Sequence, residues 1–324
     1  MKKPKKTGLI LLVFASMAFI LPGACNKAKK SEGGSEIYIP MISMGFQHQY
    51  WQAVNQGAQK AAQELGIRIT YEAPELETQV DKQLEMIEAA LAKKPAAICI
   101  APLDGMAVIP LLERAKSSKI PVICFDAGAE SDIPVALCAT DNYGASTAAA
   151  EELAKLINGS GEVAVIGYSQ TSTDAVERVR GFKDTMGKKY PNIKIVDIQY
   201  GDGDPLKSTE ITKAFLQAYP NLKAIYAANE GSAIGMINGT KEANKAGKVI
   251  LLGFDSGSIL KEAIRDRTVA GAITQNPVGI GYQAIHTAFK AQKGESVPKI
   301  VDTGFYWYTA ENMDDPDIVP CLYD

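Results

Sequence analysis

The sequence predicts an α/β protein made of two similar lobes, each built on a doubly wound parallel sheet. From Glu36 onwards, short apolar runs rich in Ile and Val alternate with longer segments of helical period, which is typical of parallel strands covered by helices on both faces. The pattern also runs twice. Ile98–Pro102 is echoed 127 positions later at Ile225–Asn229. Val122–Gly128 is echoed 129 positions later at Leu251–Gly257, so the repeat predicts two lobes of the same architecture.

Ten apolar runs are expected to form the strands, five in each lobe. They lie at Ile37–Ser43, Ile67–Glu72, Ala97–Ala101, Pro121–Asp126 and Val135–Ala139, then at Glu162–Tyr168, Ile193–Tyr200, Ala224–Ala228, Val249–Asp255 and Val269–Thr274. Eight amphipathic segments are expected to be helices, at Tyr50–Leu65, Thr78–Ala92, Met106–Ser117, Ala145–Ile157, Thr173–Tyr190, Pro205–Ala218, Gly231–Ala246 and Ser258–Asp266. Ligands of such sheets bind beyond the carboxyl ends of the strands, so two facing lobes would enclose a cleft there.

Residues 1–24 are expected to be an export signal rather than part of the fold. Four lysines precede an apolar run, Leu9–Leu21, that is too short to span a bilayer comfortably. The run leads to Gly23-Ala24-Cys25, which resembles the lipoprotein cleavage box whose cysteine receives a lipid. Pro22 stands where that box usually has Leu, so an ordinary signal with a chance cysteine stays an alternative. We expect export to the periplasm or cell surface, anchoring through lipidated Cys25, and a polar tether over residues 25–35.

The net charge and the cysteine spacing argue against two classes of function, nucleic-acid binding and metal binding. Removal of residues 1–24 takes away four lysines and no acidic residue, so the formal net charge falls from −3 to −7. An acidic chain of this kind argues against nucleic acid as a partner. The remaining cysteines lack metal-ligand spacing such as C-x-x-C and are expected to be small buried hydrophobes, while a Cys124–Cys138 or tail disulfide stays open. We expect no metal and no cofactor.

Aromatic side chains follow the first expected strand. Tyr50 and Trp51 are adjacent at a strand-to-helix turn, and His48 precedes them. A sugar packs its apolar C–H face on an aromatic ring and needs polar partners for its hydroxyls, so this turn suits a sugar. The structural alternative is that the two aromatics attach the helix to the sheet.

Two aspartates end equivalent strands of the two lobes. Asp126 and Asp255 are each followed within two residues by glycine. A carboxylate offers two acceptor oxygens for neighbouring hydroxyls, which favours ligand binding, while helix capping is the alternative role. Asn229 and Gln275 end further strands and add amides that donate and accept at once.

With these strand-end residues, the chain resembles the type I periplasmic sugar-binding proteins of the ribose-binding group. The resemblance covers almost all of Glu36–Asn312. Its most specific segments are Gly57–Lys60, Ala139–Asn142, Arg178–Phe182, Asn229-Glu230, Gly253–Asp255 and Thr274-Gln275. The resemblance implies two lobes joined by a three-crossover hinge, and a binding protein that does no chemistry on its ligand.

The family's sugar contacts can be carried over residue by residue. They fall on Tyr50 and Trp51 as stacking aromatics, on Asp126, Asn229 and Asp255 as hydroxyl binders, on Gln275 near the hinge, on Phe254 as a further pocket-lining residue, and on His48, where ribose binders have Asn. The chain departs from the family at Ala127 and Val176, where ribose binders carry arginines, and at Ala101, where they carry an Asn. Other sugars, polyols and modified pentoses are therefore as open as ribose.

The resemblance also implies the lobe boundaries and the partners. The N-terminal lobe is expected over 36–140 with 276–303, and the C-terminal lobe over 141–275 with 304–324. Thr140, Asp141 and Asn142 are expected at the hinge, with further crossings near Gln275 and Thr303. A monomer that closes around a monosaccharide or polyol would deliver it to an ABC permease. A chemoreceptor or sensor kinase that reads the closed form is the alternative.

An enzyme is the remaining alternative. Two carboxylates that face a sugar are also the equipment of a glycoside hydrolase, but no spacing in the sequence sets the separation that hydrolysis needs. Gly167–Thr171 resembles a nucleophile elbow without its final glycine. Since binding alone explains the same carboxylates, we expect no catalytic residues.

Overall fold

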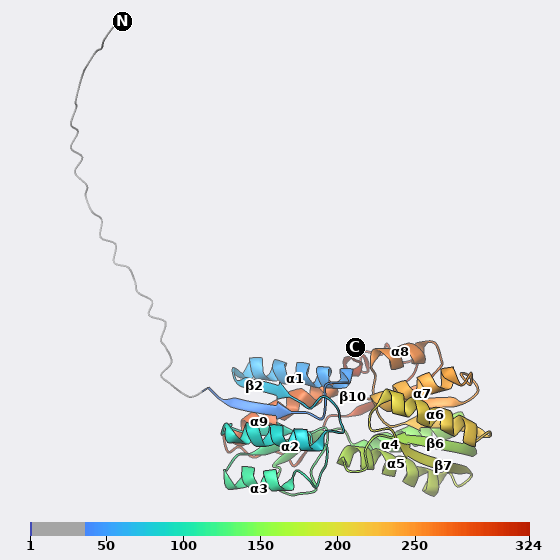
Figure 1. The fold of residues 1–324 in the computed structure, drawn as a ribbon, viewed down its shortest axis with the longest axis horizontal. Helices are drawn as coiled ribbons and strands as arrows, with labels where there is room; N and C mark the ends of the chain where they lie inside the picture. The colour runs from blue at the N-terminus through green and yellow to red at the C-terminus, as the bar shows by residue number, and fades with distance from the viewer. Residues whose placement is uncertain (2–35) are drawn as a thin grey trace. The chain divides into compact units, whose positions relative to one another are not determined.

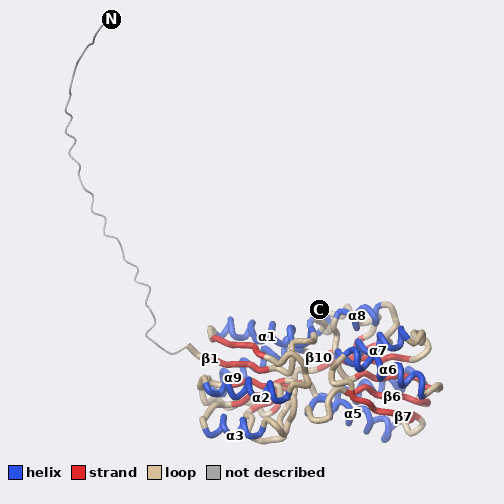
Figure 2. Tube along the Cα trace, in the orientation of Figure 1, coloured by secondary structure: helices blue, strands red, loops and turns tan. Residues whose placement is uncertain are grey.

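The computed structural model describes residues 36–324, together with Met1. The expected export signal, the tether and Cys25 lie outside the described residues. Residues 36–324 form one compact unit that contains two six-stranded sheets. Figure 1 shows the helices gathered around these two sheets, and Figure 2 shows the strands lying between layers of helices.

The first sheet is entirely parallel and has the strand order β11-β5-β4-β3-β1-β2. Its strands are β1 (Tyr38–Ile42), β2 (Arg68–Glu72), β3 (Ile98–Ile100), β4 (Val122–Phe125), β5 (Ala136–Ala139) and β11 (Ile300–Asp302). Its helices are α1 (Gln49–Leu65), α2 (Val80–Ala92), α3 (Ile109–Ser117) and α9 (Pro277–Gln292).

Helices α1 and α9 pack closely although more than 200 residues separate them in the chain. Two glycines, which lack a Cβ atom, allow the two helices to approach this closely. A Cβ atom on Gly57 would lie 1.9 Å from the carbonyl oxygen of Val278, and one on Gly281 would lie 1.9 Å from that of Val54. The late segment of the chain is thus fixed to the lobe in which the chain began.

The second sheet has the order β12-β10-β9-β8-β6-β7, and only its edge strand β12 is antiparallel. Its strands are β6 (Gly161–Gly167), β7 (Ile193–Tyr200), β8 (Leu222–Ala227), β9 (Ile250–Phe254), β10 (Gly271–Gln275) and β12 (Phe305–Tyr308). Its helices are α4 (Asn142–Leu156), α5 (Thr173–Lys189), α6 (Pro205–Ala218), α7 (Glu230–Glu242) and α8 (Ser258–Arg265), and a short 3₁₀ turn, η1 (Val319–Cys321), follows near the end.

Each sheet is covered on both faces, which gives each lobe two apolar cores. In the first lobe one core includes Ile39 and Ile280, and the other includes Ile42. In the second lobe one core includes Ile166, and the other includes Tyr226, whose ring stacks on Phe182. Strands that are buried on both faces need apolar side chains at every position. This explains the continuous Ile and Val runs in the sequence.

The chain passes between the sheets three times: from β5 to α4, from β10 to α9, and from β11 to β12. The predicted fold class, two doubly wound lobes with three crossovers, is confirmed. Two of the crossing segments contact each other, since the Thr140 hydroxyl donates to the Gly304 carbonyl at 3.5 Å. The Asn142 amide donates to the Thr140 carbonyl at 3.1 Å, and Asp141 caps α4 by accepting from the Gly144 N–H at 2.9 Å.

The observed elements differ from the expected ones mainly near the end of the chain. Helix α9 and strands β11 and β12 were not among the expected elements. Helix α7 ends at Glu242, four residues before its expected end at Ala246. It stops because Asn244 adopts a left-handed backbone with φ of 53°, which a continuing helix excludes.

The four cysteines of the described residues, Cys99, Cys124, Cys138 and Cys321, are free and buried, as expected for small hydrophobes. Within residues 36–324, no cluster of His, Cys, Asp and Glu side chains is arranged to hold a metal ion. No helix in the described part of the chain is long and apolar enough to cross a membrane.

Candidate functional site

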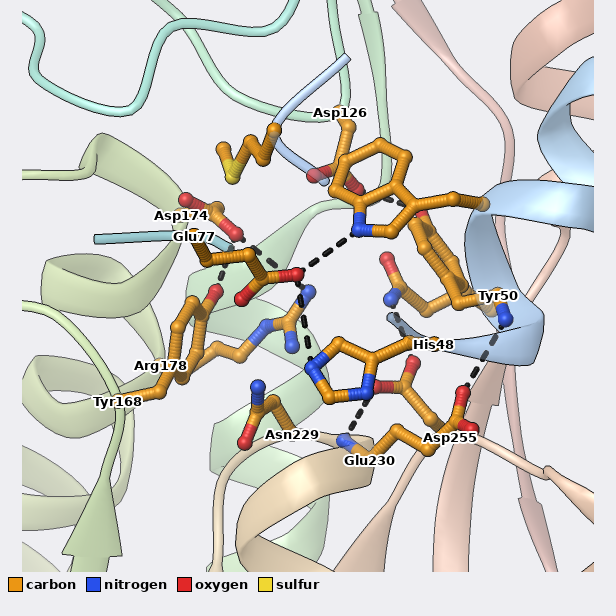
Figure 3. A pocket seen from close by; sticks show the side chains of 13 residues that line it. His48, Tyr50, Glu77, Asp126, Tyr168, Asp174, Arg178, Asn229, Glu230 and Asp255 are labelled. Atoms are coloured by element: carbon orange, nitrogen blue, oxygen red, sulfur yellow. Dashed lines mark hydrogen bonds and ion pairs between the residues drawn. The ribbon is translucent and has the colours of Figure 1, made fainter. Parts of the chain in front are cut away.

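A small cavity lies between the carboxyl ends of the two sheets. Side chains of both lobes line it: Met44, His48, Tyr50, Trp51, Glu77 and Asp126 from the first lobe, and Tyr168, Asp174, Arg178, Asn229, Glu230, Asp255 and Gln275 from the second. Figure 3 shows these side chains converging from several elements.

Seven of the eight ligand-binding residues expected from the sequence line this cavity: His48, Tyr50, Trp51, Asp126, Asn229, Asp255 and Gln275. The exception is Phe254, which is fully buried in the core of the second lobe. The guanidinium carbon of Arg178 lies 3.8 Å from the centroid of the Phe254 ring. Phe254 therefore supports a lining residue from behind instead of facing the cavity.

The paired aspartates share one backbone geometry. Asp126 follows β4 and Asp255 follows β9, and both have a left-handed backbone, with φ of 62° and 79°. Each donates its own N–H to the neighbouring strand, Asp126 to the Cys138 carbonyl at 2.9 Å and Asp255 to the Ile273 carbonyl at 2.7 Å. Non-glycine residues seldom adopt this conformation, which costs of the order of 1 kcal/mol. The turn directs both carboxylates into the cavity. Strand β5 follows Asp126, and Asp255 does not cap α8, whose N-cap is Gly257.

In the first lobe, two aromatic side chains bind carboxylates directly. The Tyr50 hydroxyl donates to Asp126. The Trp51 indole N–H donates to Glu77 Oε1 at 2.8 Å, and His48 Nε2 lies 3.6 Å from the same oxygen. Figure 3 shows the Glu77 carboxylate pointing toward the His48 ring. The two predicted stacking aromatics thus also position the carboxylates of their own lobe.

In the second lobe, Arg178 organises the lining. Its Nε donates to Asn142 Oδ1 at 2.8 Å and its Nη1 donates to the Ala228 carbonyl at 2.9 Å. Its Nη2 lies 3.8 Å from an oxygen of Asp174, which also accepts hydrogen bonds from the hydroxyls of Tyr168 and Ser172. Because Asn142 begins α4, this guanidinium links the cavity to the first crossing segment.

Asp255 and Glu230 use their oxygens to hold helix ends. Asp255 accepts from the backbone N–H of Glu230 at 2.9 Å and from the Gln275 amide at 2.7 Å. Glu230 accepts from the N–H groups of Gln49 at 3.2 Å and Tyr50 at 3.1 Å, at the start of α1 in the other lobe. An acidic side chain stabilises a helix N-terminus, where N–H groups lack partners. This contact joins the two lobes across the cleft.

Asn229 is the N-cap of α7, and its Oδ1 accepts from the Ser232 N–H at 2.9 Å. Its amide nitrogen is the part that remains for a ligand.

Burial shifts the pKa values of the lining residues. It raises the pKa of Glu77 to about 7, against a smaller opposing effect of the Trp51 hydrogen bond. Burial, followed by the charge of Asp174, raises the pKa of Asp126 well above its ordinary value. Burial also raises the pKa of Asp255, but the Arg178 guanidinium opposes that rise. Burial lowers the pKa of His48, so its ring is neutral at neutral pH.

The guanidinium of the site comes from a position that the sequence analysis did not assign to the ligand. Ala127 is buried in the apolar core of the first lobe, and Val176 is exposed, so neither replaces a lining arginine by a shorter side chain in the cavity. Arg178, two residues after Val176, lines the cavity and is buried. The site therefore holds a guanidinium, although neither Ala127 nor Val176 is an arginine.

Six lining residues were not among the predicted binders: Met44, Glu77, Tyr168, Asp174, Arg178 and Glu230. A signal for some of them was present in the sequence. Asp174 and Arg178 form an i, i+4 charged pair at the start of a helix that follows a strand, and Glu230 is adjacent to Asn229. Glu77 follows the second strand in a loop, and only its position at the carboxyl edge of the sheet could have indicated it.

Comparison with known proteins identifies the family. The model of the periplasmic binding protein domain matches residues 39–296, which is most of the chain. The chain belongs to this family. Its members are binding proteins of transporters and not enzymes, so the prediction of binding without catalysis is confirmed. Export to the periplasm is confirmed as well, whereas the lipidation of Cys25 is not tested.

Relatives of this periplasmic binding protein cover nearly the whole chain. The ribose import binding protein RbsB of Bacillus subtilis is 25% identical over 303 residues, which are 93% of this chain and 97% of the relative. A carbohydrate transporter solute-binding protein of Agrobacterium radiobacter, solved in complex with D-arabinose, is 33% identical with a TM-score of 0.86, over 90% of this chain and 100% of the other. A solute-binding protein of Agrobacterium vitis with bound D-fucose is 32% identical with a TM-score of 0.86, over 88% and 100%.

Proposed function

We propose that this protein is the solute-binding component of an ABC importer, and that it binds a monosaccharide or polyol in the cavity between its lobes. The observation that carries the proposal is the pairing of Asp126 and Asp255. These carboxylates end equivalent strands of the two lobes and enter one cavity through the same left-handed turn. A ligand with several hydroxyl groups can donate to both at once.

The relatives support a sugar as the ligand. The two Agrobacterium proteins were solved with D-arabinose and D-fucose, and the Bacillus subtilis relative is named for ribose import. In this chain Trp51 and Tyr50 supply aromatic surface for the C–H face of such a ligand. Asn229 and Gln275 supply amides beside the aspartates.

Closure of the lobes is the mechanism by which the ligand is captured. A ligand that contacts both lobes favours the form in which they meet, by its difference in affinity for the two forms. Contacts across the cleft add to this form, among them the Glu230 bonds to α1 and the hydrogen bond from the Gly128 N–H to the Thr173 hydroxyl at 2.8 Å. The paired lobes then present the surface that a membrane permease reads.

The cellular setting is part of the proposal. The protein acts as a monomer, with residues 36–140 and 276–303 as one lobe and residues 141–275 and 304–324 as the other. Thr140, Asp141 and Asn142 form its hinge. Lipidated Cys25 anchors it near the permease.

The test is thermal unfolding of the chain from Asn26 onwards against a panel of pentoses, hexoses, deoxysugars, polyols and inositols. A ligand at a hundred times its Kd adds about 2.7 kcal/mol, which raises the Tm by several degrees. We expect one sugar or polyol to do this, and Asp255→Ala to abolish the shift. Asp314→Ala, which removes an exposed aspartate far from the cavity, should leave the shift intact. A panel in which only a different class of solute raises the Tm would contradict the proposal.

A further inference from the structure

The cavity holds far more acidic than basic side chains. Five carboxylates line it: Glu77, Asp126, Asp174, Glu230 and Asp255. Among the described lining residues, Arg178 is the only side chain that stays cationic at neutral pH. His48 is neutral there because its burial lowers its pKa. A buried carboxylate without a positive partner is costly, and the raised pKa values of Glu77 and Asp126 reflect that cost.

The three carboxylates of the second lobe are accounted for by the protein itself. Asp174 is held by two hydroxyls and lies near Arg178. Asp255 accepts from a backbone N–H and from the Gln275 amide. Glu230 accepts from two backbone N–H groups and from the Tyr323 hydroxyl, the last at 3.2 Å. These groups are structural as much as they are ligand contacts.

The two carboxylates of the first lobe are different. Among the described residues, Asp126 accepts one hydrogen bond, from the Tyr50 hydroxyl, and Glu77 accepts one, from the Trp51 indole. Both donors are neutral. The side chain of Glu77 is 8% exposed, and that of Asp126 belongs to a residue only 3% exposed. Each carboxylate therefore has a further oxygen for a donor that the first lobe does not supply.

A third acceptor lies among the lining residues. Gln275 is 1% exposed, and its Oε1 has no hydrogen-bond partner in the described structure. The orientation of this amide is fixed, because its nitrogen donates to Asp255 at 2.7 Å. A buried carbonyl oxygen left without a donor costs about 1–3 kcal/mol, which a ligand that donates to it would recover.

We propose that the ligand of this cavity is a sugar or polyol that carries a protonated amino group, and that Glu77 and Asp126 bind that group. This inference rests on the proposed function and names the class of solute. An ammonium offers three donors, no acceptor and one positive charge. It matches the unfilled acceptors of Glu77, Asp126 and Gln275, and its charge favours the ionised forms of the two carboxylates. The indole ring of Trp51, which holds Glu77, adds an aromatic surface that attracts a cation.

The experiment compares pairs of solutes that differ at one group. Titration calorimetry at pH 7 on the chain from Asn26 onwards measures D-glucose against D-glucosamine, D-galactose against D-galactosamine, and D-glucitol against 1-amino-1-deoxy-D-glucitol. N-acetyl-D-glucosamine keeps the nitrogen but loses the charge, so it serves as the uncharged control. A charged hydrogen bond in a buried site predicts a preference of about 10- to 100-fold for the amine in at least one pair, and no such preference for the N-acetyl compound.

Two variants locate the effect. Glu77→Gln keeps the size of the side chain and removes its charge, so it should reduce the preference for the amine at least about tenfold. Glu75→Gln is the matched control, since Glu75 lies two residues away in the same loop and is exposed. It should leave the preference unchanged. Asp126→Asn provides a second test of the same site.

The outcomes separate this inference from the proposed function. Neutral sugars that bind as tightly as their amines, or more tightly, overturn the amine inference and leave the sugar-binding function intact. A preference that survives both Glu77→Gln and Asp126→Asn also overturns the assignment of the site. If neither amines nor any neutral sugar or polyol binds, the proposed function fails together with this inference.

Discussion

The two halves of the cavity place an aspartate at the same point of the fold but surround it differently. Asp126 and Asp255 end equivalent strands, and both have a left-handed backbone. Asp126 is held by a neutral tyrosine hydroxyl. Asp255 is held by a backbone N–H and an amide, and the charge of Arg178 lowers its pKa against the effect of burial.

The comparison shows that position and charge have separate origins. The turn at the strand end fixes where each carboxylate lies, and this follows from the repeated architecture. The neighbours fix whether it is charged, and these come from loops and helices that the repeat does not duplicate. The second half of the cavity is therefore the pre-organised half, and the first half is the one whose protonation responds to pH and to a ligand.

Removal of Arg178 should produce the largest loss of unfolding free energy. Without this cation, the second-lobe half of the cavity resembles the first-lobe half. Arg178→Ala leaves Asp174 and Asp255 without their cation and removes the bond to Asn142 at the crossing segment. Breaking a buried charged pair costs about 3–5 kcal/mol of unfolding free energy, which urea unfolding at pH 7 measures.

Arg180→Ala is the control for this experiment, since Arg180 lies in the same helix with its side chain 56% exposed. It should change the unfolding free energy by less than about 0.5 kcal/mol. Equal losses for both variants would contradict the role assigned to Arg178.

Substitution of the two aspartates by asparagine should cost less unfolding free energy than the loss of Arg178, and the two costs should differ. Asp255→Asn turns one of two occupied acceptors into a donor that faces an N–H group, so it should cost about 1–3 kcal/mol of unfolding free energy. Asp126→Asn keeps an oxygen for the Tyr50 hydroxyl and removes a poorly compensated charge, so its cost should lie near zero. Urea unfolding of the ligand-free protein at pH 7.5 measures both. The asymmetry between the halves does not hold if the two losses are equal.

The pH dependence should give a smaller change in unfolding free energy over each pH unit. The raised pKa of Glu77, about 7 against an ordinary value of 4.5, means that the folded state binds a proton more tightly than the unfolded state. Stability therefore falls as pH rises from about 4.5 to about 7, by at most about 1.4 kcal/mol per pH unit for one proton. Glu77→Gln should remove this contribution, so the variant gains stability over the wild type as pH rises.

Urea unfolding at pH 5.5, 6.5 and 7.5 checks this prediction. The difference between variant and wild type isolates Glu77 from His48, whose lowered pKa acts in the opposite direction below about pH 6.5. Asp126 titrates in both proteins and cancels in the difference. A difference that stays constant across this range would mean that Glu77 does not titrate there.

Most of the fold could be predicted from the sequence because the strands are buried on both faces and read as apolar runs. The prediction of strands and helices failed for the elements whose hydrophobic pattern is short or weak. Strands β11 and β12 are only three and four residues long, and both lie at sheet edges. Helix α9 is held largely by its packing on α1, through glycines whose role appears only when the two helices meet.

The site was predictable where strand ends determine it and unpredictable where tertiary contacts do. Asp126, Asp255 and Gln275 directly follow or end strands, so the rule for parallel sheets placed them. Glu77 reaches the cavity from a loop, held by Trp51, and nothing near it in the sequence indicates that contact. Phe254 ends a strand but faces the core, because side chains alternate across a sheet and its neighbour Asp255 leaves the strand by a turn.

The left-handed turns at Asp126 and Asp255 also constrain anyone who would re-engineer this protein as a sensor for a different solute. At positive φ, only Gly, Asn and Asp are readily accommodated, so few residue types can replace these two aspartates. Glu77 and Gln275 are not at positive φ, so the backbone does not restrict their side chains in this way. A library of variants for new ligand specificity should therefore vary Glu77 and Gln275 first and leave Asp126 and Asp255 unchanged.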